Sequence, residues 1–144
     1  MFSKIAIAYD QSPEAERAFT TAIQLAKSLG AELMTITVLE ELPAYTAYAA
    51  GTDPSAMRTL QQDRLQVYEE LRARAMTLAL REGTTVDSQL INGDTVDAIV
   101  NFVRTHKIDL LVLGLHHRSS RVSRIWSTVY SLAQDVPCCV LGVH

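Results

Sequence analysis

The stretch IDLLVLG, residues 108–114, decides the fold. Only Asp109 interrupts its apolar residues, and polar and apolar positions do not alternate. Successive side chains of a strand point to opposite faces, so this run predicts a strand that is buried on both faces. Sheets of that kind are mostly parallel and covered by helices. We therefore expect a central strand of an α/β protein here.

Strand-like and helix-like segments alternate along the rest of the chain. The other expected strands are 4–9, 32–40, 84–91 and 136–143, and the expected helices are 13–29, 54–82, one that begins after Asp94, and 123–134. In the strand at 84–91 apolar residues alternate with polar ones, which is typical of a sheet edge. This order predicts a three-layer, doubly wound parallel sheet of five strands, similar to flavodoxin and Rossmann folds.

Apolar residues at helical spacing predict which helix faces point inward. The residues on these stripes, all apolar except Arg64, are Ala18, Ala22, Leu25, Ala26 and Leu29 in the first helix, Leu60, Arg64, Val67, Leu71, Ala75 and Leu78 in the second, and Val96, Ile99, Val100 and Val103 in the third. Residues 41–53 show no period and are predicted to form a long loop. Its Tyr45 and Tyr48 either cover a ligand or pack within the loop.

Length and composition narrow the class of protein. The 144 residues suit one domain, 1–144, and 48% hydrophobic residues suffice for a core. A net charge of -3 argues against a nucleic-acid partner. We see neither a signal peptide nor an apolar run of membrane-spanning length, so we expect a cytoplasmic protein. Cys138 and Cys139 are predicted to be small, reduced core residues.

Ligands of doubly wound sheets bind beyond the carboxyl ends of the strands, where the winding direction reverses. Strands one and four should be neighbours there, which would bring Asp10 opposite the segment GLHHRSSRVSRIWST, residues 114–128. Asp10 is either an acceptor for ribose hydroxyl groups or a structural residue, namely a turn residue or a helix cap. The segment is either a phosphate-binding loop at a helix start or a solvated connection.

Glycine content bears on the phosphate interpretation. Glycines let backbone N–H groups converge on a phosphate, yet none occurs between Gly114 and Gly142. Phosphate contacts would then depend on side chains as well, namely those of Arg118, Ser119, Ser120, Arg121, Ser127 and Thr128. No metal site is predicted at His116 and His117, because no third ligand lies nearby in the sequence. Trp126 is better explained by packing in the core or a dimer interface than by stacking on a base. Neither Ser12 nor Ser119 lies in a motif of a catalytic nucleophile.

Three segments carry a resemblance to a known family: KIAIAYDQSPEAERAFTTAIQLAKSLGAELMTITVLE, INGDTVDAIVNFVRTHKIDLLVLG, and the C-terminal run IDLLVLGLHHRSSRVSRIWSTVYSLAQDVPCCVLGV. Together they resemble the universal stress protein family over nearly the whole chain. The resemblance implies an adenine nucleotide alpha hydrolase-like sheet with strand order 3-2-1-4-5. It also implies a homodimer through the last strand, residues 136–143.

Members of that family that bind ATP carry a loop with three glycines and a final hydroxyl residue. Gly114 and Thr128 match the first glycine and the hydroxyl, whereas His117 and Ser127 replace the other two glycines. Asp10 matches the acid after strand one, and Val38 a position whose backbone meets the base. The nucleotide-binding residues that the resemblance implies are Ala8, Tyr9, Asp10, Val38, Leu113, Gly114, His116, His117, Arg118, Ser127, Thr128 and Val129.

Three functions remain open from the sequence. The first is a stress-response regulatory protein that binds ATP or AMP, with Mg²⁺ only alongside ATP; AMP needs less of the glycine loop. The second is a dimeric interaction protein of the same fold without a nucleotide, as the two replaced glycines suggest. The third is a slow ATPase, which ranks last because Asp10 is the only acid that we can place near the phosphates. We assign no catalytic residue.

Overall fold

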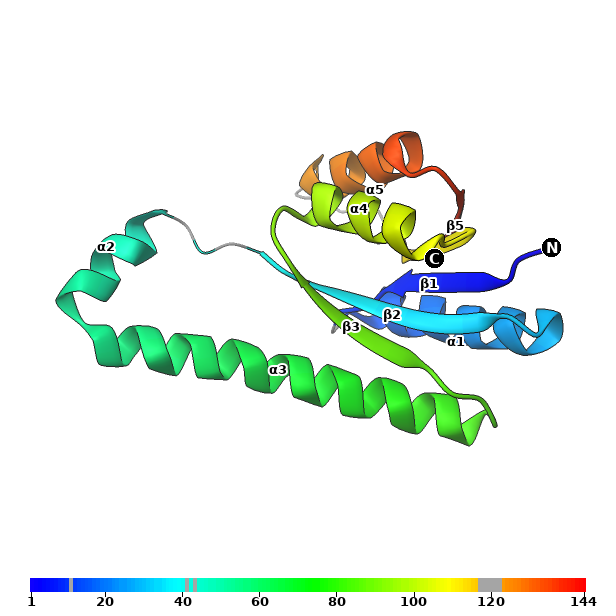
Figure 1. Ribbon diagram of the computed structural model, residues 1–144, viewed down its shortest axis with the longest axis horizontal. Coiled ribbons are helices and arrows are strands. Elements are labelled where there is room, and N and C mark those ends of the chain that lie inside the picture. The colour runs from blue at the N-terminus through cyan, green and yellow to red at the C-terminus, as the bar shows by residue number, and fades with distance from the viewer. Residues whose placement is uncertain (11, 41, 43, 117–122) are drawn as a thin grey trace.

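The computed structural model describes residues 1–10, 12–40, 42, 44–116 and 123–144, without the side chains at 47, 49, 50 and 123–127. The elements are β1 (Lys4–Ala8), α1 (Pro13–Leu29), β2 (Glu32–Leu39), α2 (Ala44–Thr52), α3 (Pro54–Arg81), β3 (Asp87–Asn92), α4 (Thr95–His106), β4 (Leu110–Gly114), α5 (Ser123–Asp135) and β5 (Cys139–Val143). Within this part of the chain, five parallel strands pair in the order β3-β2-β1-β4-β5 (Figure 1). The predicted fold class is confirmed.

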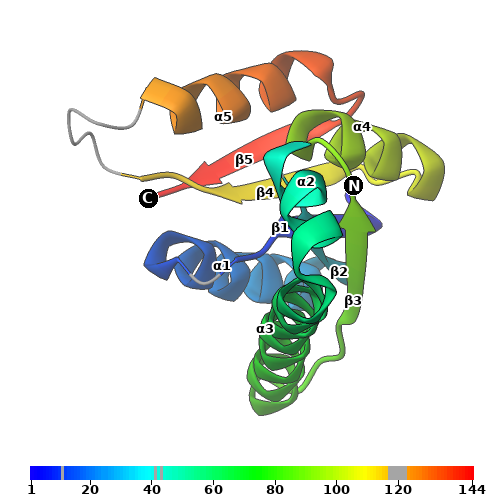
Figure 2. The same cartoon turned by 90° about the vertical axis from the view of Figure 1, so that its left-hand side faces the viewer.

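Helices cover both faces of this sheet. Figure 2 shows α4 and α5 on one face and α1 and α3 on the other. Along β4, Leu110 and Val112 belong to the core under α1 and α3, whereas Leu111 and Leu113 belong to the core under α4 and α5. All four are at most 4% exposed. The apolar run at 110–113 therefore reflects two cores that share one strand.

The first helix follows the predicted signals closely. Ser12 Oγ accepts a hydrogen bond from Ala15 N at 3.1 Å, Pro13 is the first helical residue, and Gly30 ends the helix with φ 65°. The prediction for Leu29 is wrong, because the buried stripe ends at Ala26 and the last turn leaves Leu29 42% exposed.

A helical arm replaces the predicted long loop. Residues 44–52 form α2, in keeping with the good helix propensity of their alanines, so the loop prediction is wrong there. Helix α2 packs on α3, and both extend beyond the sheet (Figure 1). The predicted inward face of α3 is correspondingly wrong at its N-terminal half. Leu60 is 38% and Val67 40% exposed, and burial along α3 starts only at Leu71.

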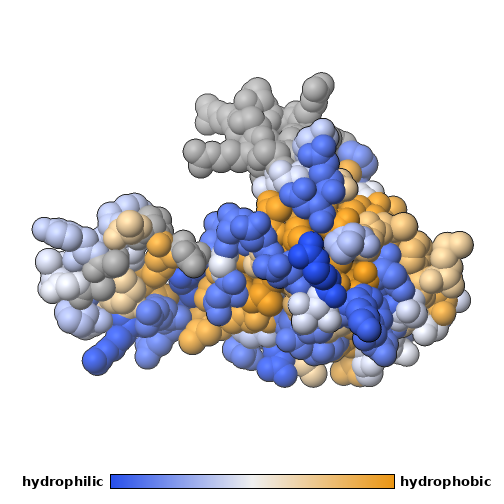
Figure 3. Space-filling view, turned by 45° about the horizontal axis from the view of Figure 1, so that its top comes forward, coloured by the Kyte–Doolittle hydropathy of each residue, from blue (hydrophilic) through white to orange (hydrophobic). Residues whose placement is uncertain are grey.

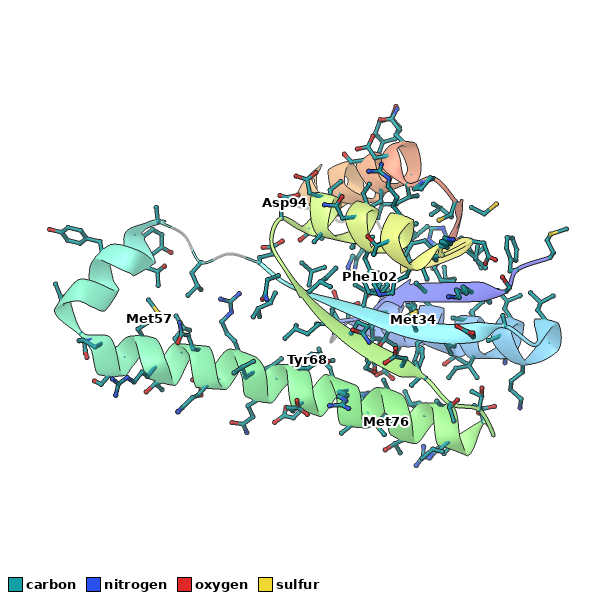
Figure 4. The ribbon with its side chains drawn as sticks, viewed as in Figure 1. Met34, Met57, Tyr68, Met76, Asp94 and Phe102 are labelled. Carbon is teal, nitrogen blue, oxygen red and sulfur yellow. The ribbon has the colours of Figure 1, made fainter. Side chains whose placement is uncertain are left out.

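The arm surface mixes apolar and polar side chains. Its exposed apolar residues include Tyr45, Tyr48 and Leu65, among the hydrophilic residues seen at the left of Figure 3. Tyr68 marks where the arm joins the body. It points from α3 toward β3 (Figure 4), and its hydroxyl donates to the Ser88 carbonyl at 3.3 Å. No helix of the described residues is both long and apolar enough to cross a membrane.

Asp109 ties β1 to β4 at the amino ends of the strands. Its carboxylate accepts from Ser3 N at 2.8 Å, Ser3 Oγ at 2.9 Å and Lys4 N at 3.1 Å. Partial burial alone would raise the pKa of Asp109, but these hydrogen bonds outweigh it and the pKa lies below its ordinary value. A polar residue just before β4 thus ties this strand to β1.

Strand β5 forms one edge of the sheet. Cys138 is half-buried, and burial raises the pKa of its thiol, whereas Cys139 is exposed. The prediction of two core cysteines is therefore wrong for Cys139, because an edge strand lacks a neighbour on one side. Strands β3, β4 and β5 also begin two or three residues later than predicted.

Candidate functional site

A cavity of about 530 Å³ opens at the carboxyl ends of the central strands. Strand β1 pairs with β2 on one side and with β4 on the other, so the winding direction reverses between β1 and β4. This is where a doubly wound sheet leaves room for a ligand, and the volume falls in the range of small-molecule sites. The predicted juxtaposition of strands one and four is confirmed.

The β1 end contributes Asp10 and the backbone before it. Asp10 is exposed, and its Oδ1 accepts from Ser12 N at 2.8 Å, so the carboxylate closes the turn before α1. This matches the turn-residue interpretation of Asp10. A carboxylate has about four acceptor sites, however, so the turn leaves capacity for ligand hydroxyl groups at the cavity wall.

Tyr9 lines the same cavity, but its ring is part of the core. The ring packs against Phe19 with centroids 5.1 Å apart, and its hydroxyl donates to Glu16 Oε1 at 2.8 Å. Burial, followed by the hydrogen bond to Glu16, raises the pKa of Tyr9 well above its usual range. Arg74 Nε lies 2.6 Å from the same Glu16 oxygen and links α3 to α1. The peptide groups of Tyr9 bond to β2: its N–H donates to Ile36 O at 2.9 Å, and its carbonyl accepts from Thr37 Oγ1 at 3.0 Å.

The β4 end approaches the first turn of α1. A Cβ atom on Gly114 would lie 2.6 Å from the carbonyl carbon of Glu14 and 2.7 Å from Ala15 N, so only glycine fits without movement. His116 Nδ1 lies 3.0 Å from Glu14 Oε2. Thr128 and Val129 of α5 line the opposite wall.

The end of β2 completes the cavity. Val38 and Glu40 line it together with Thr95, the first residue of α4, and Arg64 of α3. Thr95 Oγ1 donates to Glu40 Oε1 at 2.5 Å, and Arg64 Nη2 donates to the Glu40 carbonyl. Among the described lining residues, the fixed charges are therefore two carboxylates, Asp10 and Glu40, and one guanidinium.

Most of the predicted site residues lie around this one cavity. Those that line it are Ala8, Tyr9, Asp10, Val38, Leu113, Gly114, His116, Thr128 and Val129. The predictions for His117, Arg118, Ser119, Ser120 and Arg121, and for the side chains of Trp126 and Ser127, fall outside the described residues. Neither Tyr45 nor Tyr48 is among the lining residues, and they are 76% and 84% exposed.

Ten lining residues were not predicted: Ser12, Ala15, Ile36, Thr37, Leu39, Glu40, Arg64, Thr95, Ile99 and Leu132. Glu40 could have been found, because it lies two residues beyond Val38 and period-two alternation puts both on one face. Arg64 had no such signal, since its contact with β2 depends on how α3 crosses the sheet.

Sequence and structure comparisons identify a protein family that has this fold. The model of the universal stress protein family matches residues 1–144. The chain belongs to this family. A universal stress protein of Thermus aquaticus, encoded in the QAH/OAS sulfhydrylase 3′ region, is 32% identical over 145 residues, with all of both chains covered.

Solved structures of universal stress proteins share the fold. UspA from Lactobacillus plantarum superposes with a TM-score of 0.77 at 23% identity, covering 99% of this chain and 98% of the other. A universal stress protein in complex with cAMP gives a TM-score of 0.70 at 24% identity, covering 99% and 97%. The universal stress protein fold thus places Asp10, Gly114 and Thr128 around one cavity in this chain.

Proposed function

We propose that this universal stress protein is a cytoplasmic stress-response regulator that binds an adenine nucleotide in the cavity between β1 and β4. The observation that carries the proposal is that Asp10, Gly114 and Thr128, which are far apart in sequence, line one cavity. Neighbours of the same fold support it, since cAMP, dAMP and AMP are bound in the structures of a universal stress protein, of the Archaeoglobus fulgidus protein and of an Arabidopsis thaliana protein.

The charges favour one orientation of the nucleotide. A phosphate is attracted to the N-terminal end of α5 and repelled by the carboxylate of Asp10, whereas the charge of Glu40 is offset by Arg64 beside it. The phosphate therefore lies at the β4 end of the cavity, between Gly114 and the start of α5, and the ribose hydroxyls face Asp10. AMP is favoured over ATP, because His117 and Ser127 stand where glycines would give a triphosphate close backbone contact. Mg²⁺ would enter only with ATP.

Ligand release and thermal melting test the proposal. Mass spectrometry of denatured protein identifies any nucleotide that co-purifies, and melting with AMP, ATP and cAMP measures stabilisation. A specific ligand at 100 times its dissociation constant adds about 2.7 kcal/mol. The absence of any shift with all three nucleotides would contradict the proposal.

Variants of Asp10 separate ligand binding from turn formation. Asp10→Ala removes both the ribose acceptor and the acceptor for Ser12 N, whereas Asp10→Asn keeps an oxygen for Ser12 and loses only the charge. We expect both variants to weaken AMP binding, and only Asp10→Ala to lower stability without ligand. His117→Gly should strengthen binding. Unchanged affinity in all three variants would place the ligand elsewhere.

We also propose a homodimer through β5. Among the described residues no further strand pairs with the outer edge of β5, and a second copy related by a two-fold axis would pair with the backbone groups there. The same edge supports the second candidate function, a dimeric interaction protein without a nucleotide. Sedimentation of the protein at micromolar concentration tests the dimer, and a monomer would contradict it. A dimer that no nucleotide stabilises would favour the second candidate.

A further inference from the structure

The cavity has a polar end wall that the proposed phosphate site does not use. This wall consists of Glu40 after β2, Arg64 of α3 and Thr95 of α4. Three elements meet here, and the two side-chain contacts to Glu40 come from opposite faces of the sheet, because α3 and α4 lie on different sides (Figure 2). Glu40 is therefore held at both its carbonyl and its carboxylate.

The position of this wall follows the shape of a nucleotide. The strand ends lie in the order β2, β1, β4, and neighbouring strands are about 4.8 Å apart. Glu40, Asp10 and Gly114 thus stand in a row at the cavity mouth. With the phosphate at the β4 end and the ribose at Asp10, the base lies at the β2 end. The opposite charges of Glu40 and Arg64 cancel there, so that end offers a phosphate no net attraction.

Glu40 and Arg64 retain hydrogen-bonding capacity beyond their described contacts. Thr95 donates to one carboxylate oxygen of Glu40, and an ionised carboxylate accepts about four hydrogen bonds. Arg64 donates one bond to the Glu40 carbonyl, and a guanidinium has five N–H donors. The wall therefore presents an acceptor beside a donor, at a place fixed by three elements.

We infer that Glu40 and Arg64 read the base of the bound nucleotide. Glu40 accepts a hydrogen bond from an exocyclic amino group, and Arg64 donates to a neighbouring ring nitrogen. This inference rests on the proposed function. Adenine offers an amino donor beside ring nitrogen acceptors, and it therefore fits. In the pose that pairs Arg64 with adenine N1, a 6-oxo base such as hypoxanthine turns its oxo group toward the Glu40 carboxylate and its N1–H toward Arg64. Both hydrogen bonds are then lost, and sites built for a donor reject such a base strongly.

AMP and IMP form the sharpest pair of probes, since the 6-amino and 6-oxo bases carry the same ribose and phosphate. Calorimetric titration of the full-length protein should show AMP binding at least about ten-fold more tightly than IMP. Glu40→Gln offers an amide that can donate to an oxo group, so the preference should fall to about three-fold or less. Glu32→Gln is the matched control, because Glu32 lies at the other end of β2.

Arg64→Met tests the donor. It keeps an unbranched apolar stem and removes the guanidinium, and we expect AMP affinity to fall about ten-fold. Arg72→Met is the control on the same helix, where Arg72 is half-exposed and forms a 4.0 Å ion pair with Glu69. This control should leave AMP affinity unchanged. Melting curves without ligand confirm that all four variants are folded.

The outcomes separate this inference from the proposed function. Equal affinity for AMP and IMP in the wild type would overturn the inference, as would an unchanged preference in Glu40→Gln. If either result is obtained and Asp10→Asn still weakens AMP binding, the proposed function stands and residues other than Glu40 and Arg64 recognise the base. Binding of neither nucleotide would overturn both.

Discussion

Gly114→Ala is the most direct test of how the crevice is built. The residue ends β4 where this strand meets the first turn of α1. An added Cβ would lie 2.6 Å from the carbonyl carbon of Glu14, 2.7 Å from Ala15 N and 2.8 Å from the Glu14 carbonyl oxygen. All three are backbone atoms, so no side-chain rotation can relieve the overlap. Either β4 or the start of α1 must move.

The size of the effect follows from that movement. The shortest contact must lengthen from 2.6 Å to about 3.4 Å before it becomes an ordinary van der Waals contact. Forcing an extra methyl group into a packed site costs about 1–3 kcal/mol. At about 4 °C per kcal/mol for a chain of this length, the melting temperature should fall by roughly 4–12 °C. Since Gly114 and Asp10 line one cavity, stabilisation by AMP should also shrink.

Gly142→Ala is the matched control. Its Cβ would lie 2.6 Å from Leu115 Cδ1, an equally short contact, but that atom ends a flexible side chain that can rotate away. We expect a loss below about 1 kcal/mol. Differential scanning calorimetry of both variants measures the contrast. If Gly114→Ala melts within about 1 °C of the wild type, the close approach of β4 to α1 does not exist in solution and the reasoning fails.

Three further variants test the fold and its titrating groups. Asp109→Asn should cost about 1–3 kcal/mol at pH 7 in urea unfolding. The stabilisation from the lowered pKa of Asp109 is complete above the unfolded-state pKa of 3.8 and is lost as the pH falls through the folded-state pKa. The loss in Asp109→Asn should therefore shrink below pH 3.8, and equal losses at pH 7 and pH 3 would contradict this. Leu71→Ala should cost about 2–5 kcal/mol and Leu65→Ala less than about 0.5, since they are 6% and 51% exposed; similar losses would refute a projecting arm. Tyr9→Phe should cost about 1–2 kcal/mol, because the hydrogen bond to Glu16 is lost. The raised pKa of Tyr9 makes the wild type lose stability as the pH rises above 10, the unfolded-state pKa, and phenylalanine removes this contribution. An unchanged loss of stability above pH 10 in the variant would argue against this.

The sheet could be predicted because its signals are local. A strand that divides two cores must be apolar on both faces, and residues 108–114 show this directly. Helix α1 could be predicted from Ser12, Pro13 and Gly30, whose roles depend only on the neighbouring backbone. Right-handed crossovers then left few strand orders. These features need no information about distant contacts.

The arm and the end wall could not be predicted for the opposite reason. A helical stripe shows which residues share a face, but it does not show where the sheet beneath that face ends. Leu60 and Val67 continue the stripe of Leu71 and Ala75, yet no core covers them and they stay exposed. Arg64 lies on that same stretch and reaches the carbonyl of Glu40 instead of a core. Its place in the cavity depends on tertiary geometry alone.

The packing of Gly114 reduces its value as evidence for a phosphate-binding loop at residues 114–128. The glycine is required by the backbone of Glu14 and Ala15, so its presence would be expected whether or not a phosphate binds nearby. It therefore supports the fold more than the ligand. Asp10 discriminates better, because the turn uses only part of its acceptor capacity and alanine or asparagine there would leave the sheet intact. A melt in which AMP stabilises the wild type but not Asp10→Asn, with equal stability of the two without ligand, would separate a nucleotide site from a turn that resembles one.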